Sequence, residues 1–205
     1  DRLRAMLGVA PDQLLVGTVS CLKPQKSPED FVRVAALVCQ RVPAARCVLV
    51  GDGALRPKVE ALLLEQGLQD RVTLLGWRRD VAALLKAFDV FVLTSQWEGL
   101  PCAILEARAS RIPIVATRVG GAAEAIVEGI QGTLCPAGDV RAMAERVCQI
   151  LEDERFRADL RAGMQELPEE FTIQETLKQY QSLYAYLLHA TRPSEDVMKL
   201  QPNRL

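Results

Sequence analysis

The sequence predicts an α/β fold in three layers, α/β/α, with a mainly parallel sheet of about six strands. Short runs rich in β-forming residues alternate with segments of helical length and periodicity, which is typical of βαβ units. Several of these runs, such as 46–51 and 90–95, are apolar throughout, as expected for strands covered by helices on both faces. The 205 residues, of which 49% are hydrophobic, suffice for a large domain with a sizeable core.

The first half of the chain predicts strands followed by helices. "LLVGTVS" predicts a strand at 14–20. The helix expected at 27–42 has Ser27 at its N-cap and Pro28 at its first position, with two acidic residues behind them. The next elements are expected as a strand at 46–51, a helix at 54–68 that stops near Gly67, a strand at 71–76 and a helix at 80–88.

The second half continues the alternation and ends in helices. After a strand at 90–95, a helix is expected at 101–110, beginning near Pro101. The later elements are expected as a strand at 113–117, a helix at 121–129 ended by Gly129, a short strand and turn at 132–138 and helices at 139–153 and 154–165. A last helix is expected at 172–190, with Leu177, Tyr180, Tyr184, Leu187 and Leu188 at helical spacing, followed by a polar tail at 191–205.

Charge and composition argue against several classes of function. The net charge is −1 and no segment is dominated by Lys or Arg, so we expect no nucleic-acid partner. No apolar run reaches the ~20 residues that span a bilayer, and no signal peptide is visible, which indicates a cytoplasmic protein or a piece of a longer chain. The six cysteines form no C-x-x-C pair and His189 is the only histidine. We therefore expect no metal site, and cysteines buried as small hydrophobic residues in a reducing compartment.

Several well-known catalytic motifs are absent from the sequence. It contains no P-loop, no G-x-G-x-x-G after the first strand, no G-x-S-x-G elbow and no D-x-D pair at a strand end. Candidate chemistry lies instead in loops that follow the strands, because a parallel sheet binds ligands at the carboxyl ends of its strands. These loops are "CLKPQKS" (21–27), "GDGAL" (51–55), "GWRRD" (76–80) and "SQWEGLP" (95–101).

The stretch "WEGLPCAILEA" has the features of an anion-binding helix start. The first amides of a helix lack partners, the helix dipole is positive there, and Gly99 allows close approach. Glu106 lies on the same helix face as Cys102, among residues expected to be buried, where a vicinal diol such as ribose would satisfy its carboxylate. Glu98, on the loop, can accept from hydroxyls beyond the phosphates. Spacing alone leaves open that Glu98 is solvated and that Glu106 forms a surface salt bridge.

The other loops supply a cation, glycines and an aromatic side chain. Lys26 precedes a helix start, where it can meet a diphosphate, and Lys23 is the alternative cation. Gly51 and Gly53 allow close backbone approach, or form a plain strand-to-helix turn. Trp77 and the backbone after it can border a flat ring, or the indole covers the sheet edge.

Taken together, these segments resemble the C-terminal, nucleotide-sugar-binding half of a family 4 (group 1) glycosyltransferase with the GT-B fold. The resemblance covers most of the chain to about residue 190 and rests on its E-x7-E pattern, Glu98 to Glu106, followed by "PIVATRVGG". The matching segments are "VGTVSCLKPQK" (16–26), "VLVGDGALRPKVEALLLEQGLQDRVTLLGW" (48–77), residues 89–139 and "FTIQETLKQYQSLYAYLL" (171–188). It implies a Rossmann-like domain, one half of a bacterial-like, two-domain enzyme.

The resemblance also implies roles for the site residues. Lys26 and the amides of Gly99 and Leu100 would bind the donor diphosphate, with Glu98 on the transferred sugar and Glu106 on the ribose. Glu98 and Lys26 would act in catalysis, which in this family is usually retaining and metal-independent, and the catalytic His would lie in the other domain. The nucleobase pocket would be lined by Trp77, Arg78, Asp80 and Cys102. No cofactor is implied, and UDP is the expected nucleotide of the donor, with GDP and ADP as alternatives.

The sequence departs from the family pattern in two respects. Cys21 stands where the family usually has an arginine near the diphosphate, so leaving-group stabilisation is weaker, or Lys23 replaces it. Arg108 and Arg111 stand where small residues are usual, and Arg108 either pairs with an acid or faces solvent.

The resemblance implies a domain organisation and a setting. Residues 1–13 would be the remnant of an interdomain linker, 14–168 the nucleotide-sugar domain and 169–190 a helix that packs toward the missing domain. The fragment alone would be inactive. The acceptor, a glycan or lipid-linked glycan, would bind the other half of a cytoplasmic enzyme at the inner face of the membrane, where the longer protein can associate peripherally. The alternatives are a nucleotide-binding regulatory module that has lost transfer and, ranked lower, a GT-B-fold nucleotide-sugar epimerase.

Overall fold

The computed structural model describes residues 2–164 and 168–190 of the chain. The chain divides into two compact units, residues 1–166 and residues 167–205. The first unit contains the sheet and most of the helices, and the second contains one long helix. The tail expected at 191–205 lies outside the described residues.

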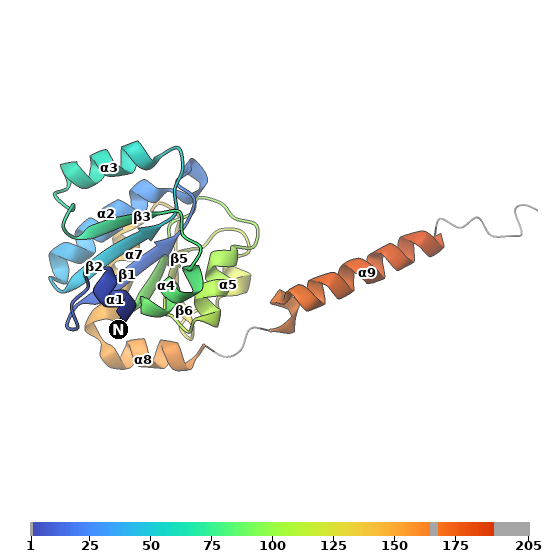
Figure 1. The fold of residues 1–205 in the computed structure, drawn as a ribbon. Coiled ribbons are helices and arrows are strands. Elements are labelled where there is room, and N and C mark those ends of the chain that lie inside the picture. The colour runs from blue at the N-terminus through green and yellow to red at the C-terminus, as the bar shows by residue number, and fades with distance from the viewer. Residues whose placement is uncertain (1, 165–167, 191–205) are drawn as a thin grey trace, which may run out of the picture. The chain divides into compact units, whose positions relative to one another are not determined.

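The first unit is built on six parallel strands in the order β3-β2-β1-β4-β5-β6 (Figure 1). The first strand, β1, lies in the middle of the sheet, and β2 and β3 follow on one side of it. The strands β4, β5 and β6 follow on the other side. The predicted α/β class and the parallel sheet are thereby confirmed, and the switch in direction falls between β1 and β4. The strands are β1 (Leu14–Val19), β2 (Ala45–Val50), β3 (Val72–Gly76), β4 (Val90–Leu93), β5 (Ile114–Thr117) and β6 (Gly132–Cys135).

Helices cover both faces of this sheet. Side chains of α2, α3 and α7 belong to one hydrophobic cluster, and those of α4, α5 and α6 belong to the cluster on the opposite face. The helices of the first unit are α1 (Arg2–Met6), α2 (Pro28–Arg41), α3 (Arg56–Glu65), α4 (Val81–Ala87), α5 (Cys102–Ala109), α6 (Ala122–Ala125), α7 (Val140–Glu152) and α8 (Glu154–Ala162), with a 3₁₀ turn, η1 (Pro24–Lys26). The result is the predicted three-layer arrangement.

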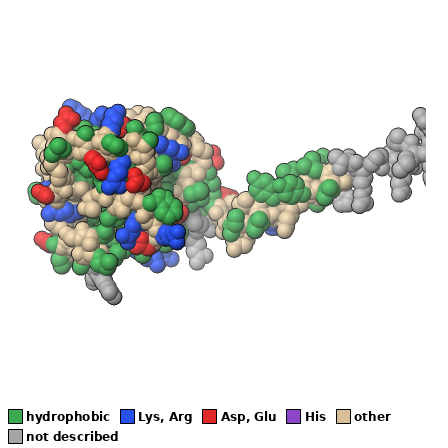
Figure 2. All heavy atoms as spheres, turned by 45° about the horizontal axis from the view of Figure 1, so that its top comes forward, with side chains coloured by type: hydrophobic (Ala, Val, Ile, Leu, Met, Phe, Trp, Pro, Cys, Tyr) green, Lys and Arg blue, Asp and Glu red, His purple; other side chains and the backbone are tan. Residues whose placement is uncertain are grey.

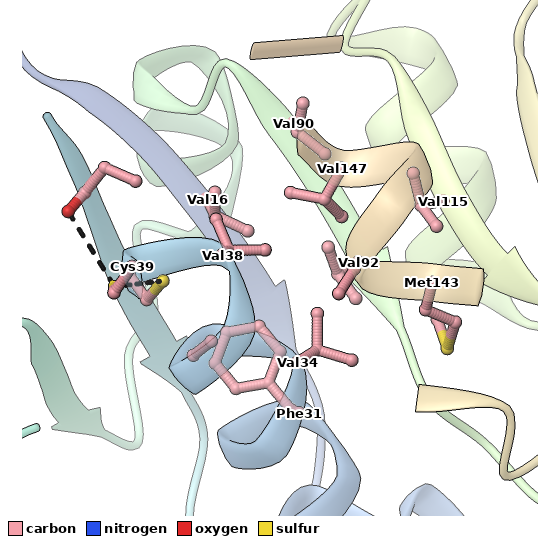
Figure 3. Close-up of a cluster of buried hydrophobic side chains, with 14 of the residues drawn as sticks. Val16, Phe31, Val34, Val38, Cys39, Val90, Val92, Val115, Met143 and Val147 are labelled. Carbon is pink, nitrogen blue, oxygen red and sulfur yellow. Dashed lines mark hydrogen bonds between the residues drawn. The ribbon is translucent and has the colours of Figure 1, made fainter. Parts of the chain in front are cut away.

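The core on the α2 and α7 face follows directly from the apolar strands. Figure 3 shows side chains of these two helices packed over valines of the sheet. Such strands have no polar face to turn toward water, so they are stable only between two helical layers. The labelled residues are Val16, Phe31, Val34, Val38, Cys39, Val90, Val92, Val115, Met143 and Val147.

Three local expectations are corrected by the backbone. The helix expected at 121–129 ends at Ala125, because Ile126 is already extended (φ −129°, ψ 126°), and Gly129 (φ 78°) serves a later turn. Pro101 is the N-cap of α5 rather than its first residue. Ser27 stands at the N-cap of α2, but its hydroxyl donates to a carboxylate oxygen of Asp30 (2.7 Å) instead of accepting from a helix amide.

The segment expected as a linker remnant contains the short helix α1. Arg4 anchors it to the amino-terminal edge of the sheet by donating to the carbonyls of Gln13 (2.6 Å) and Ala87 (2.9 Å) and to the Asp89 carboxylate (2.9 Å). The same Asp89 oxygen accepts the backbone N–H of Leu15 (2.8 Å). These contacts attach the first residues of the chain to the Rossmann-like unit.

Arg108 does not face solvent, which was one of the two alternatives for this position. Its side chain is buried, and one guanidinium N–H donates to the carbonyl of Ala125 (2.9 Å), which links α5 to α6. Burial lowers the pKa of its guanidinium. Arg111 lies in the exposed turn after α5 with a left-handed backbone (φ 56°).

The second unit consists of a short 3₁₀ turn, η2 (Glu169–Phe171), and α9 (Ile173–Ala190), close to the predicted helix at 172–190. Figure 2 shows hydrophobic side chains running along this helix. They are exposed, which is unusual for so many large apolar groups on one element. Within the described ranges, no helix combines the length and apolarity needed to cross a membrane. The exposed apolar residues are Ile173, Leu177, Tyr180, Leu183, Tyr184, Tyr186, Leu187 and Leu188.

Candidate functional site

The loops at the carboxyl edge of the sheet enclose a cavity of about 300 Å³. This volume is at the lower end of the range for small-molecule sites. Five of the predicted site residues line it together. The other predicted site residues do not belong to its walls, namely Lys26, Gly53, Asp80, Glu98, Gly99, Leu100 and Cys102. The lining residues are Val19, Ser20, Cys21, Val50, Gly51, Asp52, Trp77, Arg78, Val81 and Glu106.

Glu106 presents an unpartnered carboxylate to this cavity. The residue is exposed rather than buried as expected, and its side chain forms no hydrogen bond or ion pair among the described residues. The surrounding walls nevertheless desolvate the carboxyl group enough to raise its pKa. The surface salt bridge left open by the sequence is therefore not formed. A carboxylate in this setting is ready to accept hydrogen bonds from a ligand that carries hydroxyl groups.

Glu98 is held by residues from two loops. Its side chain is only 6% exposed and forms an ion pair with Lys26, which reaches it from the β1 loop. One carboxylate oxygen, Oε1, accepts from Lys26 Nζ and from the Ser95 hydroxyl (2.6 Å). Lys23, the alternative cation, is exposed, and its side chain has no partner among the described residues. The structure thus places Lys26, not Lys23, beside Glu98, and the solvated alternative for Glu98 is wrong.

The helix start after Glu98 is open to an approaching anion. Gly99 and Leu100 are exposed, and a Cβ placed on Gly99 would meet no atom within 4 Å. The helix α5 has no side-chain cap at Pro101, so its first amides have no side-chain acceptor. This geometry is suited to a phosphate, which both the amides and the helix dipole would stabilise.

The glycines Gly120 and Gly121, after β5, hold the backbone of this loop. Gly121 N–H donates to the carbonyl of Gly99 (2.7 Å). A Cβ on Gly120 would lie 1.8 Å from the carbonyl oxygen of Glu98, so no larger residue fits there without displacing the loop. The pair was visible in the sequence only as part of the family pattern, and its packing role depends on the contact between the β4 and β5 loops.

Close packing against a neighbouring loop also explains why glycine stands at positions 51 and 53. A Cβ on Gly51 (φ 130°) would lie 1.9 Å from the carbonyl oxygen of Ser20, and one on Gly53 would lie 2.6 Å from that of Leu22. Both glycines therefore let the β2 loop pack against the β1 loop. Gly51 also lines the cavity, but close packing of the two loops is sufficient to require glycine at both positions.

Arg78 and Asp80 neutralise each other beside the cavity. Arg78 Nε and Nη2 donate to the two carboxylate oxygens of Asp80 at 2.8 and 2.6 Å. The hydrogen bonds from Arg78 lower the pKa of Asp80. Trp77, 74% exposed, offers a free aromatic surface next to this pair. This end of the cavity therefore offers the flat apolar ring of Trp77 and the backbone beside it, while the charges of Arg78 and Asp80 are paired with each other.

Three residues of the site were missed by sequence reasoning. Ser95 and Gln25 contact Glu98, the latter at 3.5 Å, and Asp52 lines the cavity while paired with Arg56 (3.0 Å). Ser95 is the last residue of the run expected as a strand, and polar residues at the carboxyl ends of strands are the signal that points to it.

The six cysteines fall into two classes. Cys21 and Cys102 are exposed, contrary to the expectation that all six are buried. Both lie at the carboxyl edge of the sheet, where packing gives way to an open site. Burial raises the pKa of Cys135 and of Cys148 in the other class. The buried cysteines are Cys39, Cys47, Cys135 and Cys148.

Iodoacetamide is expected to alkylate Cys21 and Cys102 first in the folded protein. The buried thiols should react at least about tenfold more slowly, because the reagent needs access to the sulfur atom. Mass spectrometry of peptides after timed quenching gives the individual rates. A parallel reaction in denaturant is the control, in which all six should react at similar rates. Equal labelling of all six in the folded protein would contradict the observed burial.

Solved structures share this architecture. An Anabaena protein, Alr3699/HepE, crystallised in complex with UDP, superposes with a TM-score of 0.81 at 28% identity, over 90% of this chain and 52% of that one. The C-terminal domain of a glycosyl transferase group 1 family protein, LpcC, from Francisella tularensis has a TM-score of 0.72 at 20% identity, a likeness of fold, over 79% of this chain and 87% of that one.

Curated relatives agree with the structural neighbours. N-acetyl-alpha-D-glucosaminyl L-malate synthase from Bacillus anthracis is 31% identical over 184 residues, which is 89% of this chain and 48% of the relative. An Escherichia coli UDP-Gal:alpha-D-GlcNAc-diphosphoundecaprenol alpha-1,3-galactosyltransferase is 32% identical over 157 residues, 75% of this chain and 41% of the relative. The chain thus spans about half the length of these relatives. Residues 1–166 match the sequence model of "Glycosyl transferases group 1", and the chain belongs to that family.

Proposed function

We propose that this chain is the donor-binding, C-terminal half of a glycosyltransferase that moves a sugar from a nucleotide diphosphate sugar to an acceptor. The observation that carries the proposal is the unpartnered Glu106 carboxylate in a cavity beside the open start of α5. A nucleoside diphosphate fits both features at once, since it combines a ribose diol with adjacent phosphates. Few other small ligands present these groups at neighbouring positions.

The proposed roles follow the order of groups along the donor. The base would lie against Trp77, and Glu106 would accept hydrogen bonds from the ribose hydroxyls. The diphosphate would bind the amides of Gly99 and Leu100, with Lys26 as its cation. Glu98 lies beside Lys26 and would therefore face the transferred sugar.

The chemistry needed from this half is stabilisation of the leaving group. As the sugar departs, negative charge grows on the diphosphate, and preorganised donors lower the barrier most when they face that charge. In this proposal Lys26 and the amides of Gly99 and Leu100, just before α5, are such donors. Retention of configuration and transfer without a resident metal are further parts of the proposal, supported by the family resemblance.

UDP is the proposed nucleotide of the donor. Support comes from HepE, solved with UDP and with UDP-glucose, and from the E. coli relative, whose name specifies UDP-Gal. The acceptor would bind the other half of a longer enzyme. A binding module without transfer activity is the second candidate, and it is favoured by the cavity itself. Cys21 stands where the family usually has an arginine. Among the described residues that line the cavity, the one cation, Arg78, is paired with Asp80.

Isothermal titration of the chain with UDP, GDP and ADP tests the proposal. We expect one nucleotide, UDP, to bind with a dissociation constant in the micromolar to low millimolar range. A sugar without nucleotide, such as glucose, serves as the control ligand and should give no heat at these concentrations. Absence of binding by all three nucleotides at several millimolar, with the fold verified by circular dichroism, would contradict the donor-site proposal.

A further inference from the structure

We infer that Ser95 is a positioning residue that fixes the Glu98 carboxylate in the orientation used for the donor sugar. The inference rests on the proposed function of Glu98. Ser95 is fully buried at the end of β4, and its hydroxyl donates to Oε1 of Glu98 at 2.6 Å. It therefore contacts Glu98 without reaching the ligand site itself.

The two carboxylate oxygens of Glu98 differ in their surroundings. Oε1 accepts two hydrogen bonds, from Ser95 and from Lys26. Oε2 is approached only by Gln25 Nε2 among the described residues, at 3.5 Å, which is too long for a strong hydrogen bond. Saturation of one oxygen leaves the other to accept from a hydroxyl of the ligand. By donating to Oε1, Ser95 helps to leave Oε2 as the oxygen that accepts from the ligand.

Lys26 cannot fulfil this role alone once a donor is bound. Its ammonium group is a point charge on a flexible stem, and a diphosphate of greater charge would compete with Glu98 for it. The Ser95 hydroxyl has no such competitor. It is positioned by packing and by the Thr117 hydroxyl, which donates to the carbonyl of Ser95 at 2.6 Å. In the bound state, Ser95 is the rigid contact that remains on Oε1.

The test compares Ser95→Ala with the unmodified chain by titration with UDP and with a panel of UDP-glucose, UDP-galactose and UDP-GlcNAc. If the nucleotide titration selects GDP or ADP, the matching sugar series replaces it. Ser95→Ala is expected to weaken binding of the best UDP-sugar about tenfold, the effect of losing a hydrogen bond to a charged group, and binding of UDP less than twofold. A role in folding alone would weaken both ligands equally.

Two further variants keep the test decisive. Thr133→Val removes another buried hydroxyl, which has no hydrogen-bond partner in the described part of the chain, and should alter neither affinity. Glu98→Gln tests the route of the effect. Combined with Glu98→Gln, Ser95→Ala should add less than a further twofold loss, because Ser95 acts through the carboxylate.

The outcomes separate this inference from the proposed function. If the unmodified chain binds no nucleotide, the proposed function fails. Three results would refute the positioning role of Ser95 while nucleotide binding stands. The unmodified chain could bind UDP and every UDP-sugar equally well, or Ser95→Ala could weaken UDP and UDP-sugar binding equally. The third is a loss from Ser95→Ala that is additive with the loss from Glu98→Gln. If Ser95→Ala does not fold, Thr117→Val, which loosens Ser95 alone, is expected to weaken UDP-sugar binding and leave UDP binding unchanged. If Thr117→Val changes the affinities for UDP and for UDP-sugar by the same factor, the inference is overturned.

Discussion

Replacing Glu106 with alanine is expected to weaken nucleotide binding by roughly 30- to 150-fold, equivalent to about 2–3 kcal/mol. The loss follows from the proposed contact between this carboxylate and two ribose hydroxyls, since hydrogen bonds to a charged group are the stronger kind. The fold should not suffer, because no described residue forms a hydrogen bond or ion pair with the Glu106 side chain. Titration calorimetry and thermal unfolding of the same samples measure the two effects separately.

Glu145→Ala is a matched control for this substitution. Glu145 is an exposed helical glutamate without an ion pair among the described residues, and it lies on α7, away from the proposed nucleotide site. Its removal should change nucleotide affinity less than twofold. A comparable loss in both variants would show that the effect of Glu106→Ala is not specific to the cavity.

The pH dependence of the same group gives a second readout. The folded protein raises the pKa of Glu106 above its ordinary value of 4.5, so the folded state favours the protonated form. Any stability that Glu106 contributes is present below that ordinary value and is lost as pH rises through the higher, folded pKa. Glu106→Gln should therefore be neutral or stabilising at pH 7. Nucleotide affinity should depend on pH with the opposite sign to this stability. It should fall as pH drops through the raised pKa of Glu106 toward 4.5, because the ionised carboxylate is the acceptor.

Replacing Gly120 with alanine is expected to displace the loop that carries Glu98. The left-handed backbone at this position (φ 49°) costs an L-residue about 1 kcal/mol, and the clash of the new Cβ with the Glu98 carbonyl adds about 1–3 kcal/mol. The melting temperature should fall by several degrees. We also expect at least a tenfold loss of UDP-sugar affinity, since Glu98 and the Gly99 amide would move with their backbone.

Gly129→Ala separates the clash from the backbone strain. Gly129 has a similar left-handed conformation (φ 78°), but a Cβ there would meet nothing within 4 Å. This variant should lose only about 1 kcal/mol of stability and keep the unmodified affinity for UDP-sugar. If both glycine variants behave alike, the packing of Gly120 on the Glu98 loop is not what positions the site.

The order of elements and the nature of the sheet could be predicted from the sequence. Apolar runs such as 46–51, the helical periodicity between them and the position of Pro28 are local signals, because each depends on neighbours within a few residues. One error in an element, the end of the helix after Gly121, arose where such signals are weakest. Gly129 indicated a stop, but the backbone had already become extended at Ile126.

The candidate site could be predicted only in outline. The sequence placed Glu98 and Glu106 on either side of a helix start, and it left Lys26 and Lys23 as alternatives for the cation. Only the tertiary structure brought Lys26 to Glu98, across 72 positions of sequence, and showed that no described residue pairs with the Glu106 side chain.

By itself, then, the sequence determined the parallel α/β architecture and the family pattern of this protein, because local periodicity and ordered motifs record both. The tertiary structure decided which groups of the site meet. Lys26 reaches Glu98, and Gly120 packs against the same loop, because β1, β4 and β5 are neighbours in the sheet. Strand order is set by packing of the whole domain, so a contact between two loops cannot be recognised from the residues of either loop alone.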